Sequence, residues 1–168
     1  MIEIIKNKFN IKEENINRTV VRVKALIINS KNEILLAHSY GEYQFPGGHV
    51  EANEELPFAL HRELLEETGL YFDTDNLKPF AVCKQYWQDY PSLNINSKFE
   101  IYYYEIKDDR VPDLAKTNLT EEEKDGNFKL RYIPLNIVED VVKSNMLING
   151  DPQGIGTEML EIFSRVLK

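Results

Sequence analysis

Residues 18–39, "RTVVRVKALIINSKNEILLAHS", contain two runs of β-branched and aliphatic residues separated by a short polar stretch. Val, Ile and Thr favour an extended backbone, whereas Asn and Ser between two apolar runs favour a chain reversal. The segment therefore predicts two strands, residues 19–28 and 33–38, joined by the turn 29–32.

Three later segments predict strands and two predict helices. "KPFAVCKQYWQ" and "SKFEIYYYEIK" are rich in β-branched and aromatic residues and predict two long strands joined by the polar loop 89–96, and "NFKLRYIP" predicts another strand. Apolar residues spaced three and four apart in "LNIVEDVVKSN" and "GTEMLEIFSRVLK" predict two C-terminal helices.

A loop with several glycines and one central helix separate the two sets of strands. The loop contains "YGEYQFPGGHV", and the helix is predicted over residues 56–68 because Pro57 suits a first turn and Gly69 suits a C-terminal cap. Strands first, a helix in the middle and helices at the end predict an α/β fold, in which a mixed β-sheet is covered on both faces.

The length and composition predict a single domain, residues 1–168. A chain of 168 residues that is 42% hydrophobic can bury one core. The single cysteine, Cys83, excludes an internal disulfide and is expected in the core. Because the apolar runs are too short to span a bilayer and "MIEIIKNKFN" lacks a signal-peptide pattern, we expect a soluble cytoplasmic protein that does not bind membranes.

The net charge of -8 restricts the ligands that the chain can bind by itself. Stable nucleic-acid binding needs clustered Lys and Arg, so an acidic chain argues against it. An anionic small molecule would instead be held through a divalent cation, because carboxylates are the ligands that Mg2+, Mn2+ and Ca2+ prefer.

The predicted central helix carries an acidic cluster on one face. Glu63, Glu66 and Glu67 have the spacing i, i+3 and i+4, so their carboxylates repel one another within an arc of about 100°. A solvated acidic face is the ordinary explanation of such a cluster. Here the same arc continues through Leu56, Ala59 and Leu60, so the acids extend a stripe that should be buried.

The other sides of this helix also carry apolar residues. Phe58, Leu64 and Leu65 predict that its first half is packed between two layers. Carboxylates at the edge of a packed helix need partners, because an unpaired buried charge is costly. Arg62, four residues before Glu66, neutralises one acid, and one or two bound cations would neutralise the others.

The spacing in this region resembles a known signature. The chain matches, without departure, the box of the Nudix hydrolases, with fixed positions at Gly48, Glu54, Arg62, Glu63, Leu64, Glu66, Glu67, Gly69 and Leu70. The order of the flanking elements is also similar to the α/β/α sandwich of this family from about residue 19 onward. Residues 1–18 form an N-terminal extension outside the resemblance.

The resemblance implies a hydrolase that cleaves a nucleoside diphosphate linked to another moiety, with Mg2+ or Mn2+ as cofactor. It implies that Glu63, Glu66 and Glu67 bind the metal and that Gly48, together with Gly47, lets a backbone carbonyl approach it. Arg62 then orients the catalytic carboxylates together with Glu54.

The general base is either Glu63 or a distal acid in the segment before the strand "NFKLRYIP", where Glu121, Glu122 and Glu123 lie. A solvated charged loop or the start of a short helix is the alternative explanation of these three acids. The resemblance also leaves the substrate open among nucleoside triphosphates, ADP-ribose, nucleotide sugars and dinucleoside polyphosphates. A homodimer is compatible with the family.

Several other side chains have both a functional and a structural interpretation. His38, His49 and His61 lie near the box as possible acids or bases, although two of them occupy variable positions in or beside it. Aromatic side chains either stack on a nucleobase or pack in the core, namely Tyr43, Phe45, Tyr86 and Trp87. Two rival classes are a nucleotide-binding sensor without activity and a Ca2+-stabilised structural domain; the second would not need Arg62 or Gly69 at these spacings.

Overall fold

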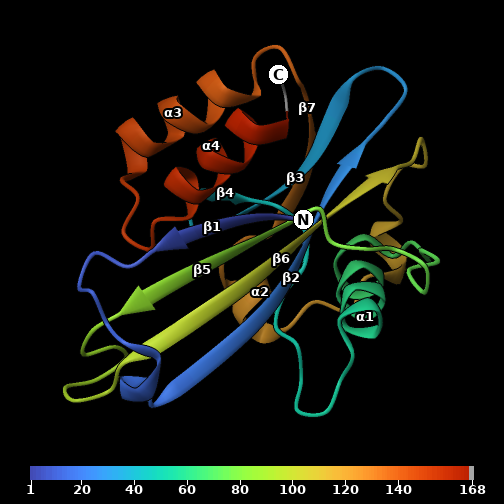
Figure 1. The fold of residues 1–168 in the computed structure, drawn as a ribbon. Helices are drawn as coiled ribbons and strands as arrows, with labels where there is room; N and C mark the ends of the chain where they lie inside the picture. The colour runs from blue at the N-terminus through green and yellow to red at the C-terminus, as the bar shows by residue number, and fades with distance from the viewer. Residues whose placement is uncertain (167–168) are drawn as a thin grey trace. The chain divides into compact units, whose positions relative to one another are not determined.

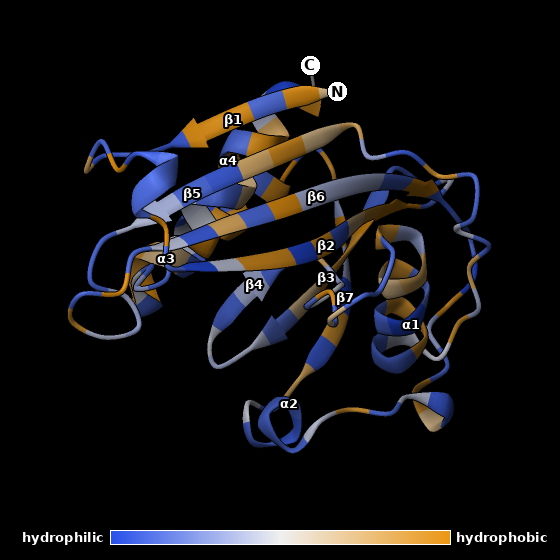
Figure 2. Cartoon of the chain, turned by 60° about the horizontal axis from the view of Figure 1, so that its bottom comes forward, coloured by the Kyte–Doolittle hydropathy of each residue, from blue (hydrophilic) through white to orange (hydrophobic). Residues whose placement is uncertain are grey.

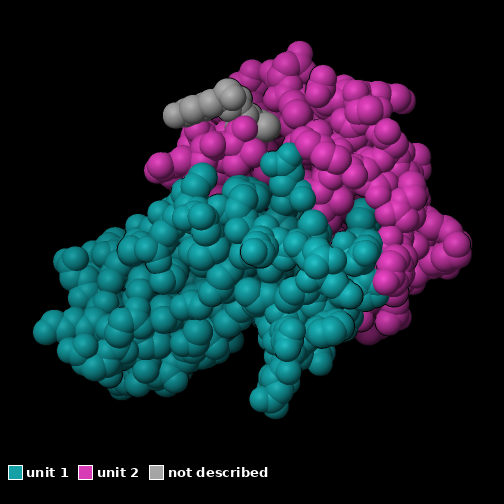
Figure 3. All heavy atoms as spheres, turned by 45° about the vertical axis from the view of Figure 1, so that its right-hand side comes forward, with its two compact units in different colours: residues 1–25, 47–63, 72–105 teal, residues 26–46, 64–71, 106–168 magenta. Residues whose placement is uncertain are grey.

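The computed structural model of the chain describes residues 1–166, which fall into two compact units (Figure 3). Unit 1 contains residues 1–25, 47–63 and 72–105, and unit 2 contains residues 26–46, 64–71 and those from 106 onward. Among the described residues, no helix is long and apolar enough to cross a membrane. The prediction of a single domain stays a prediction.

Unit 1 is built on four neighbouring strands, in the order β1, β5, β6 and β2 (Figure 1). Their bounds are Ile2–Lys6 for β1, Ala81–Trp87 for β5, Ser97–Lys107 for β6 and Arg18–Ile28 for β2. The last residues of β2 and β6 belong to unit 2. Strand β1 is parallel to β5, and β5 is antiparallel to β6, so the predicted mixed sheet of an α/β fold is confirmed.

The N-terminal extension is part of this sheet. Strand β1 pairs with the whole of β5, from Ile2 opposite Ala81 to Lys6 opposite Gln85, and Ile4 is buried. A short 3-10 turn, Glu13–Asn15, follows it. Residues 1–18 therefore have a defined structure, which depends on a partner strand about eighty residues away in sequence.

Unit 2 combines three strands with the C-terminal helices. Strand β3 (Glu33–Ser39) pairs with the end of β2, with β4 (Glu42–Gln44) and with β7 (Lys129–Pro134). Helices α3 (Val138–Asn149) and α4 (Ile155–Val166) lie side by side (Figure 1). The ring of Phe45 packs edge-on against Phe163 of α4, with 5.3 Å between ring centroids, and both rings are buried.

The predicted strands and helices agree with the structure in type and nearly in extent. The first helix of the C-terminal pair begins at Val138 rather than residue 135. The second begins at Ile155, and the end of its predicted range, residues 167–168, lies outside the described residues. The predicted glycine-containing loop also contains the short strand β4, which is defined only by its pairing with β3.

Helix α1 (Leu56–Thr68) has the predicted bounds. Ala59, Leu60 and Leu64 are buried, but Phe58 and Leu65 are 58% and 37% exposed. The expectation that apolar packing surrounds the first half of this helix is therefore wrong. The helix buries only the side that carries Ala59, Leu60 and Leu64, and Phe58 and Leu65 face solvent.

Candidate active site

The glycine pair before α1 lies tightly against strand β2. Gly47 has φ +123°, and a Cβ atom at this position would lie 2.2 Å from the carbonyl oxygen of Val23. The N–H of Val23 donates a hydrogen bond to the carbonyl of Gly48, at 3.0 Å. Only glycine fits this backbone conformation and this approach, so β2 determines where the turn lies.

The carboxylate of Glu63 occupies the space beside Gly48. A Cβ atom at Gly48 would lie 2.2 Å from Glu63 Oε2 and 2.8 Å from Oε1. The missing side chain of Gly48 is therefore what allows the Glu63 carboxylate to reach the turn. The glycine turn and the first acid of the helix therefore lie together in unit 1.

Arg62 connects three groups of the box. Its Nε and Nη2 donate to the two carboxylate oxygens of Glu54, at 2.9 and 2.8 Å. Its Nη1 donates to Glu63 Oε1 at 2.6 Å, and Nη2 also donates to the carbonyl of His49 at 2.9 Å. This two-point pairing with Glu54 is geometrically demanding, and it holds the guanidinium in a single orientation.

The electrostatics of this group favour its charged form. Hydrogen bonds from Arg62 lower the pKa of Glu54, and the N–H of Glu51 contributes a further bond at 2.9 Å. In turn, the bonds to Glu54 and then to Glu63 raise the pKa of the Arg62 guanidinium. Arg62 and Glu54 thus form an ionised, hydrogen-bonded pair, and Arg62 of this pair also binds Glu63.

Glu66 and Glu67 follow Glu63 on the same helix. Glu67 is buried, at 3% exposure, and Glu66 is half-buried. The backbone carbonyl of Glu66 accepts a hydrogen bond from the N–H of Asn118, at 2.8 Å. Glu66 and Asn118 both belong to unit 2, so this bond attaches the segment that contains Asn118 to the last turn of α1.

These acids provide the oxygen donors that a hard divalent cation requires, but they do not form a ready-made cluster. Across residues 1–166, no three His, Cys, Asp or Glu side chains are grouped as a metal site. The donor set fits Mg2+ or Mn2+ by its chemistry, and the space beside Gly48 fits a carboxylate. The role of Glu63, Glu66, Glu67 and Gly48 as metal ligands stays a prediction.

The distal acids belong to a short helix, α2 (Glu121–Asp125), which is blue along its length in the hydropathy colours of Figure 2. The side chain of Thr120 accepts from the N–H of Glu123, and the Glu123 carboxylate accepts from the Thr120 N–H, which completes a capping box. Lys124 donates to Glu121 at 2.6 Å, and Glu122 is exposed. The alternative of a short helix is confirmed, since two of the three acids stabilise it.

The three histidines have different surroundings. His61 Nδ1 donates to the carbonyl of Phe72 at 2.9 Å, and His38 packs edge-on against Tyr43 with 4.8 Å between ring centroids. His49 Nε2 accepts from Arg22 Nε at 3.2 Å. Desolvation, and then the positive charge of Arg22, lower the pKa of His49 to about 4, so its ring is neutral at pH 7.

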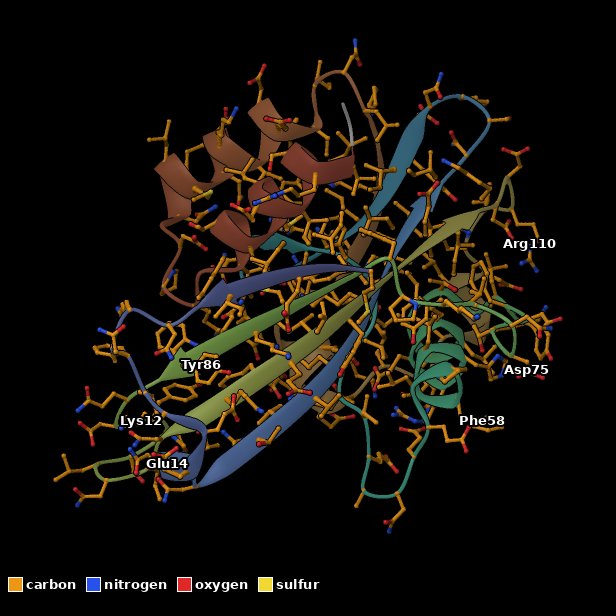
Figure 4. The ribbon with its side chains drawn as sticks, in the orientation of Figure 1. Lys12, Glu14, Phe58, Asp75, Tyr86 and Arg110 are labelled. Carbon is orange, nitrogen blue, oxygen red and sulfur yellow. The ribbon has the colours of Figure 1, made fainter. Side chains whose placement is uncertain are left out.

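Two of the candidate stacking residues are structural. Phe45 is buried in the core of unit 2. Tyr86 of β5, labelled in Figure 4, is buried and donates its hydroxyl to Glu13. In contrast, Trp87 is half-buried and packs against Tyr90, with 5.9 Å between ring centroids.

The structure adds residues that the sequence pattern did not single out. A cleft of about 670 Å³ in unit 1 is bordered by the segment 49–56 on one side and by residues of β2 and β6 on the other, including Arg18, Glu100 and Tyr102. An isolated bridge between Arg22 and His49 holds the box segment beside β2. Alternation along β2 could have identified Arg18 and Arg22 as neighbours on one face, but not their proximity to His49.

Comparisons with known proteins agree with this geometry. A family model described as the NUDIX domain matches residues 18–146. An RNA pyrophosphohydrolase of Pasteurella multocida (strain Pm70) is 46% identical over 50 residues, which is 29% of this chain and 25% of that protein. The RNA pyrophosphohydrolase of Hamiltonella defensa (strain 5AT) is 42% identical over 52 residues, 30% of this chain and 32% of that protein. The chain thus spans a quarter to a third of the length of these curated relatives.

Solved structures share the fold. The MutT protein from Methanosarcina mazei Go1 has a TM-score of 0.50 and 20% identity, over 73% of this chain and 82% of its own. The mMutator MutT protein from Bacillus halodurans has a TM-score of 0.53 and 18% identity, over 72% of each chain. At such identities the similarity establishes the architecture alone.

Proposed function

The chain belongs to the NUDIX family, and on that premise we propose that it is a divalent-metal-dependent hydrolase that cleaves the diphosphate bond of a nucleoside diphosphate linked to another moiety. The observation that carries the proposal is the contact between Gly48 and the Glu63 carboxylate, with Arg62 held on Glu54 beneath it.

Gly48 and the charged residues of the box each have a role in this proposal. Glu63, Glu66 and Glu67 would hold Mg2+ or Mn2+ together with the carbonyl of Gly48, which accepts one hydrogen bond and has a second lone pair. The bound metal would supply neutralisation of phosphate charge and activation of water. Arg62 acts as a positioning residue, because its bonds to Glu54 fix the direction of the bond to Glu63.

The general base remains a choice between Glu63 and a distal acid. Glu63 is the candidate closest to the glycine turn. Among the distal acids, Glu122 is the better candidate, because the carboxylates of Glu121 and Glu123 already pair with Lys124 and cap α2. The attachment of Asn118 to Glu66 supports a place for this segment near the last turn of α1.

A second candidate function is hydrolysis of a pyrophosphate group on RNA. The curated relatives are RNA pyrophosphohydrolases, and they match this chain at 42–46% identity over short segments. A binding protein without activity is the rival from another class, and the intact charged positions of the box argue against it.

A substrate panel tests the proposal. Nucleoside triphosphates, ADP-ribose, nucleotide sugars, dinucleoside polyphosphates and a 5′-triphosphorylated oligonucleotide would be incubated with Mg2+ or Mn2+, and released phosphate and nucleotide would be measured. We expect turnover of at least one substrate with metal and none in excess EDTA. Binding without turnover of any substrate would instead support the sensor, and full turnover in EDTA would exclude metal dependence.

A further inference from the structure

A row of cations and aromatic rings runs across unit 1 beside the candidate active site. The Cζ atoms of Arg18 and Arg22 lie 5.9 and 5.8 Å from the ring centroid of Phe99. The ring of Phe99 packs on Tyr90, and Tyr90 packs on Trp87, each with 5.9 Å between centroids. The name cation–aromatic strip is used here for six residues, namely Arg22, Arg18, Phe99, Tyr90, Trp87 and Lys8.

One end of the strip contacts the box. Arg22 Nε donates to the ring of His49, and the carbonyl of His49 accepts from Arg62, which also holds Glu63. His49 directly follows Gly48. The strip therefore starts beside the turn at which the diphosphate is proposed to react.

The other end of the strip lies at a pocket of about 430 Å³. Its lining comes from the extension and from β5, namely Lys6, Asn7, Lys8, Gln85, Tyr86 and Trp87. Lys8 Nζ lies 5.7 Å from the ring centroid of Trp87 and 4.7 Å from that of Phe9. A volume of this size suits one nucleotide, since small-molecule pockets span roughly 300–1,000 Å³.

Half of the lining of this pocket, Lys6, Asn7 and Lys8, precedes the family match, which begins at residue 18, and the other half belongs to β5 within the match. The loop that carries Lys8 is held by Asn7, whose side chain donates to the carbonyl of Ile11 at 2.8 Å and accepts from its N–H at 2.9 Å. The hydroxyl of Tyr86 is bound to Glu13 of the same extension. The part of the pocket wall that comes from the extension is thus structurally supported.

The strip is unusual in a chain with net charge -8. Two guanidinium groups lie close to one ring, and Lys8 lies at the last ring, without an acid among the six residues. Like charges that share one ring repel each other, and an anion between them would relieve the repulsion. Cations at both ends of a run of half-buried and exposed rings match the phosphates and bases of a single-stranded nucleic acid.

We propose that the cation–aromatic strip binds a short single-stranded oligonucleotide that extends from the reacting 5′-polyphosphate, with one nucleotide in the N-terminal pocket. The placement of the 5′-polyphosphate at the box rests on the proposed function. Bases stack on Trp87 and Phe99, and phosphates pair with Arg18, Arg22 and Lys8. The preferred substrate class is therefore a polyphosphorylated oligonucleotide rather than a mononucleotide, and the acidic remainder of the chain limits binding to a few nucleotides.

The fluorescence of Trp87, the only tryptophan in the chain, reports binding without turnover. We would titrate a tetranucleotide 5′-triphosphate and a nucleoside triphosphate in metal-free buffer. We expect the tetranucleotide to quench Trp87 and to bind at least about fivefold more tightly, since each stacked base adds affinity. The double variant Lys8→Ala/Arg18→Ala, at two exposed residues, should lose at least about fivefold of this affinity.

The matched control is Lys12→Ala/Lys78→Ala, which removes two exposed lysines of unit 1 that do not belong to the strip and should bind as the wild type does. Equal affinity for the mononucleotide and the tetranucleotide, or unchanged affinity in Lys8→Ala/Arg18→Ala, would overturn the inference. Quenching by a dinucleoside tetraphosphate alone would also overturn it. Hydrolysis with Mg2+ is assayed separately, so tight binding without turnover would reject the proposed function and not the strip.

Discussion

The carboxylate of Glu63 lies beside Gly48 and accepts a hydrogen bond from Arg62, and we expect the chemical step to depend on it. The variant Glu63→Gln keeps the shape and an oxygen for the bond from Arg62, but it removes the charge that binds metal or accepts a proton. We expect kcat to fall at least about 10²-fold. The free energy of unfolding in metal-free buffer should change by less than about 1 kcal/mol, because repulsion from Glu66 and Glu67 is also removed.

Glu55→Gln is the control for this measurement. Glu55 is exposed and lies outside the fixed positions of the box, so its kcat should equal that of the wild type. Steady-state kinetics on the best substrate of the panel, with chemical denaturation of each variant, provides both readouts. A Glu63→Gln enzyme at wild-type rate, beside an impaired Glu55→Gln, would show that the box positions are assigned wrongly.

The Glu54–Arg62 pair should make stability depend on acid pH. Hydrogen bonds from Arg62 lower the pKa of Glu54 below its usual 4.5 in the folded chain, so the unfolded chain takes up the proton first as pH falls. The contribution of the pair is therefore present above pH 4.5 and is lost as pH falls through the folded pKa. Glu54→Gln should cost about 1.5–3 kcal/mol at pH 7 and progressively less below pH 4.5. Urea unfolding at several pH values tests this, and a cost that stayed constant down to pH 3 would contradict it.

At the scale of the element, the end of α1 depends on Gly69. This residue has φ +68°, and a Cβ atom would lie 2.1 Å from the carbonyl oxygen of Asp113, whose N–H is bonded to Thr68. Gly69→Ala should destabilise the protein through both the backbone conformation and the clash. Gly154→Ala is the matched control, because Gly154 has φ +72° but no atom within 4 Å of its Cβ position. We expect the control to cost about 1–2 kcal/mol and Gly69→Ala at least about 1 kcal/mol more, measured by thermal unfolding. Equal destabilisation by the two substitutions would contradict this, because it would show that the backbone at Asp113 moves away from the new Cβ atom without a measurable loss of stability.

At the scale of the whole molecule, an acidic chain that binds a divalent cation only when folded should be stabilised by it. Ligation would offset repulsion among Glu63, Glu66 and Glu67, and a ligand at about 100 times its Kd adds about 2.7 kcal/mol. We expect millimolar Mg2+ or Mn2+ to raise Tm by several degrees relative to EDTA, at matched ionic strength. Glu66→Gln should reduce this shift, whereas Glu55→Gln should retain it. An identical Tm with and without metal would contradict binding at these acids.

Local signals in the sequence were sufficient to predict most of the elements, although not β1 or β4, and the order of the box. Pro57 and Gly69 mark the ends of α1, and β-branched runs mark β2, because the interactions that start and end an element lie within a few residues. The spacing of Glu63, Glu66 and Glu67 on one face also follows from helix geometry alone. These features do not depend on a distant partner.

Tertiary structure alone decided the contacts between segments. Nothing local in residues 2–6 specifies a parallel pairing with β5, and the exposure of Phe58 depends on which side of α1 is covered. The proximity of Arg22 to His49, and of Lys8 to Trp87, likewise joins residues that are 27 and 79 positions apart. Strand pairing and burial are settled by the packing of the complete chain, since the same short segment can serve as an edge strand, a central strand or a loop according to its neighbours.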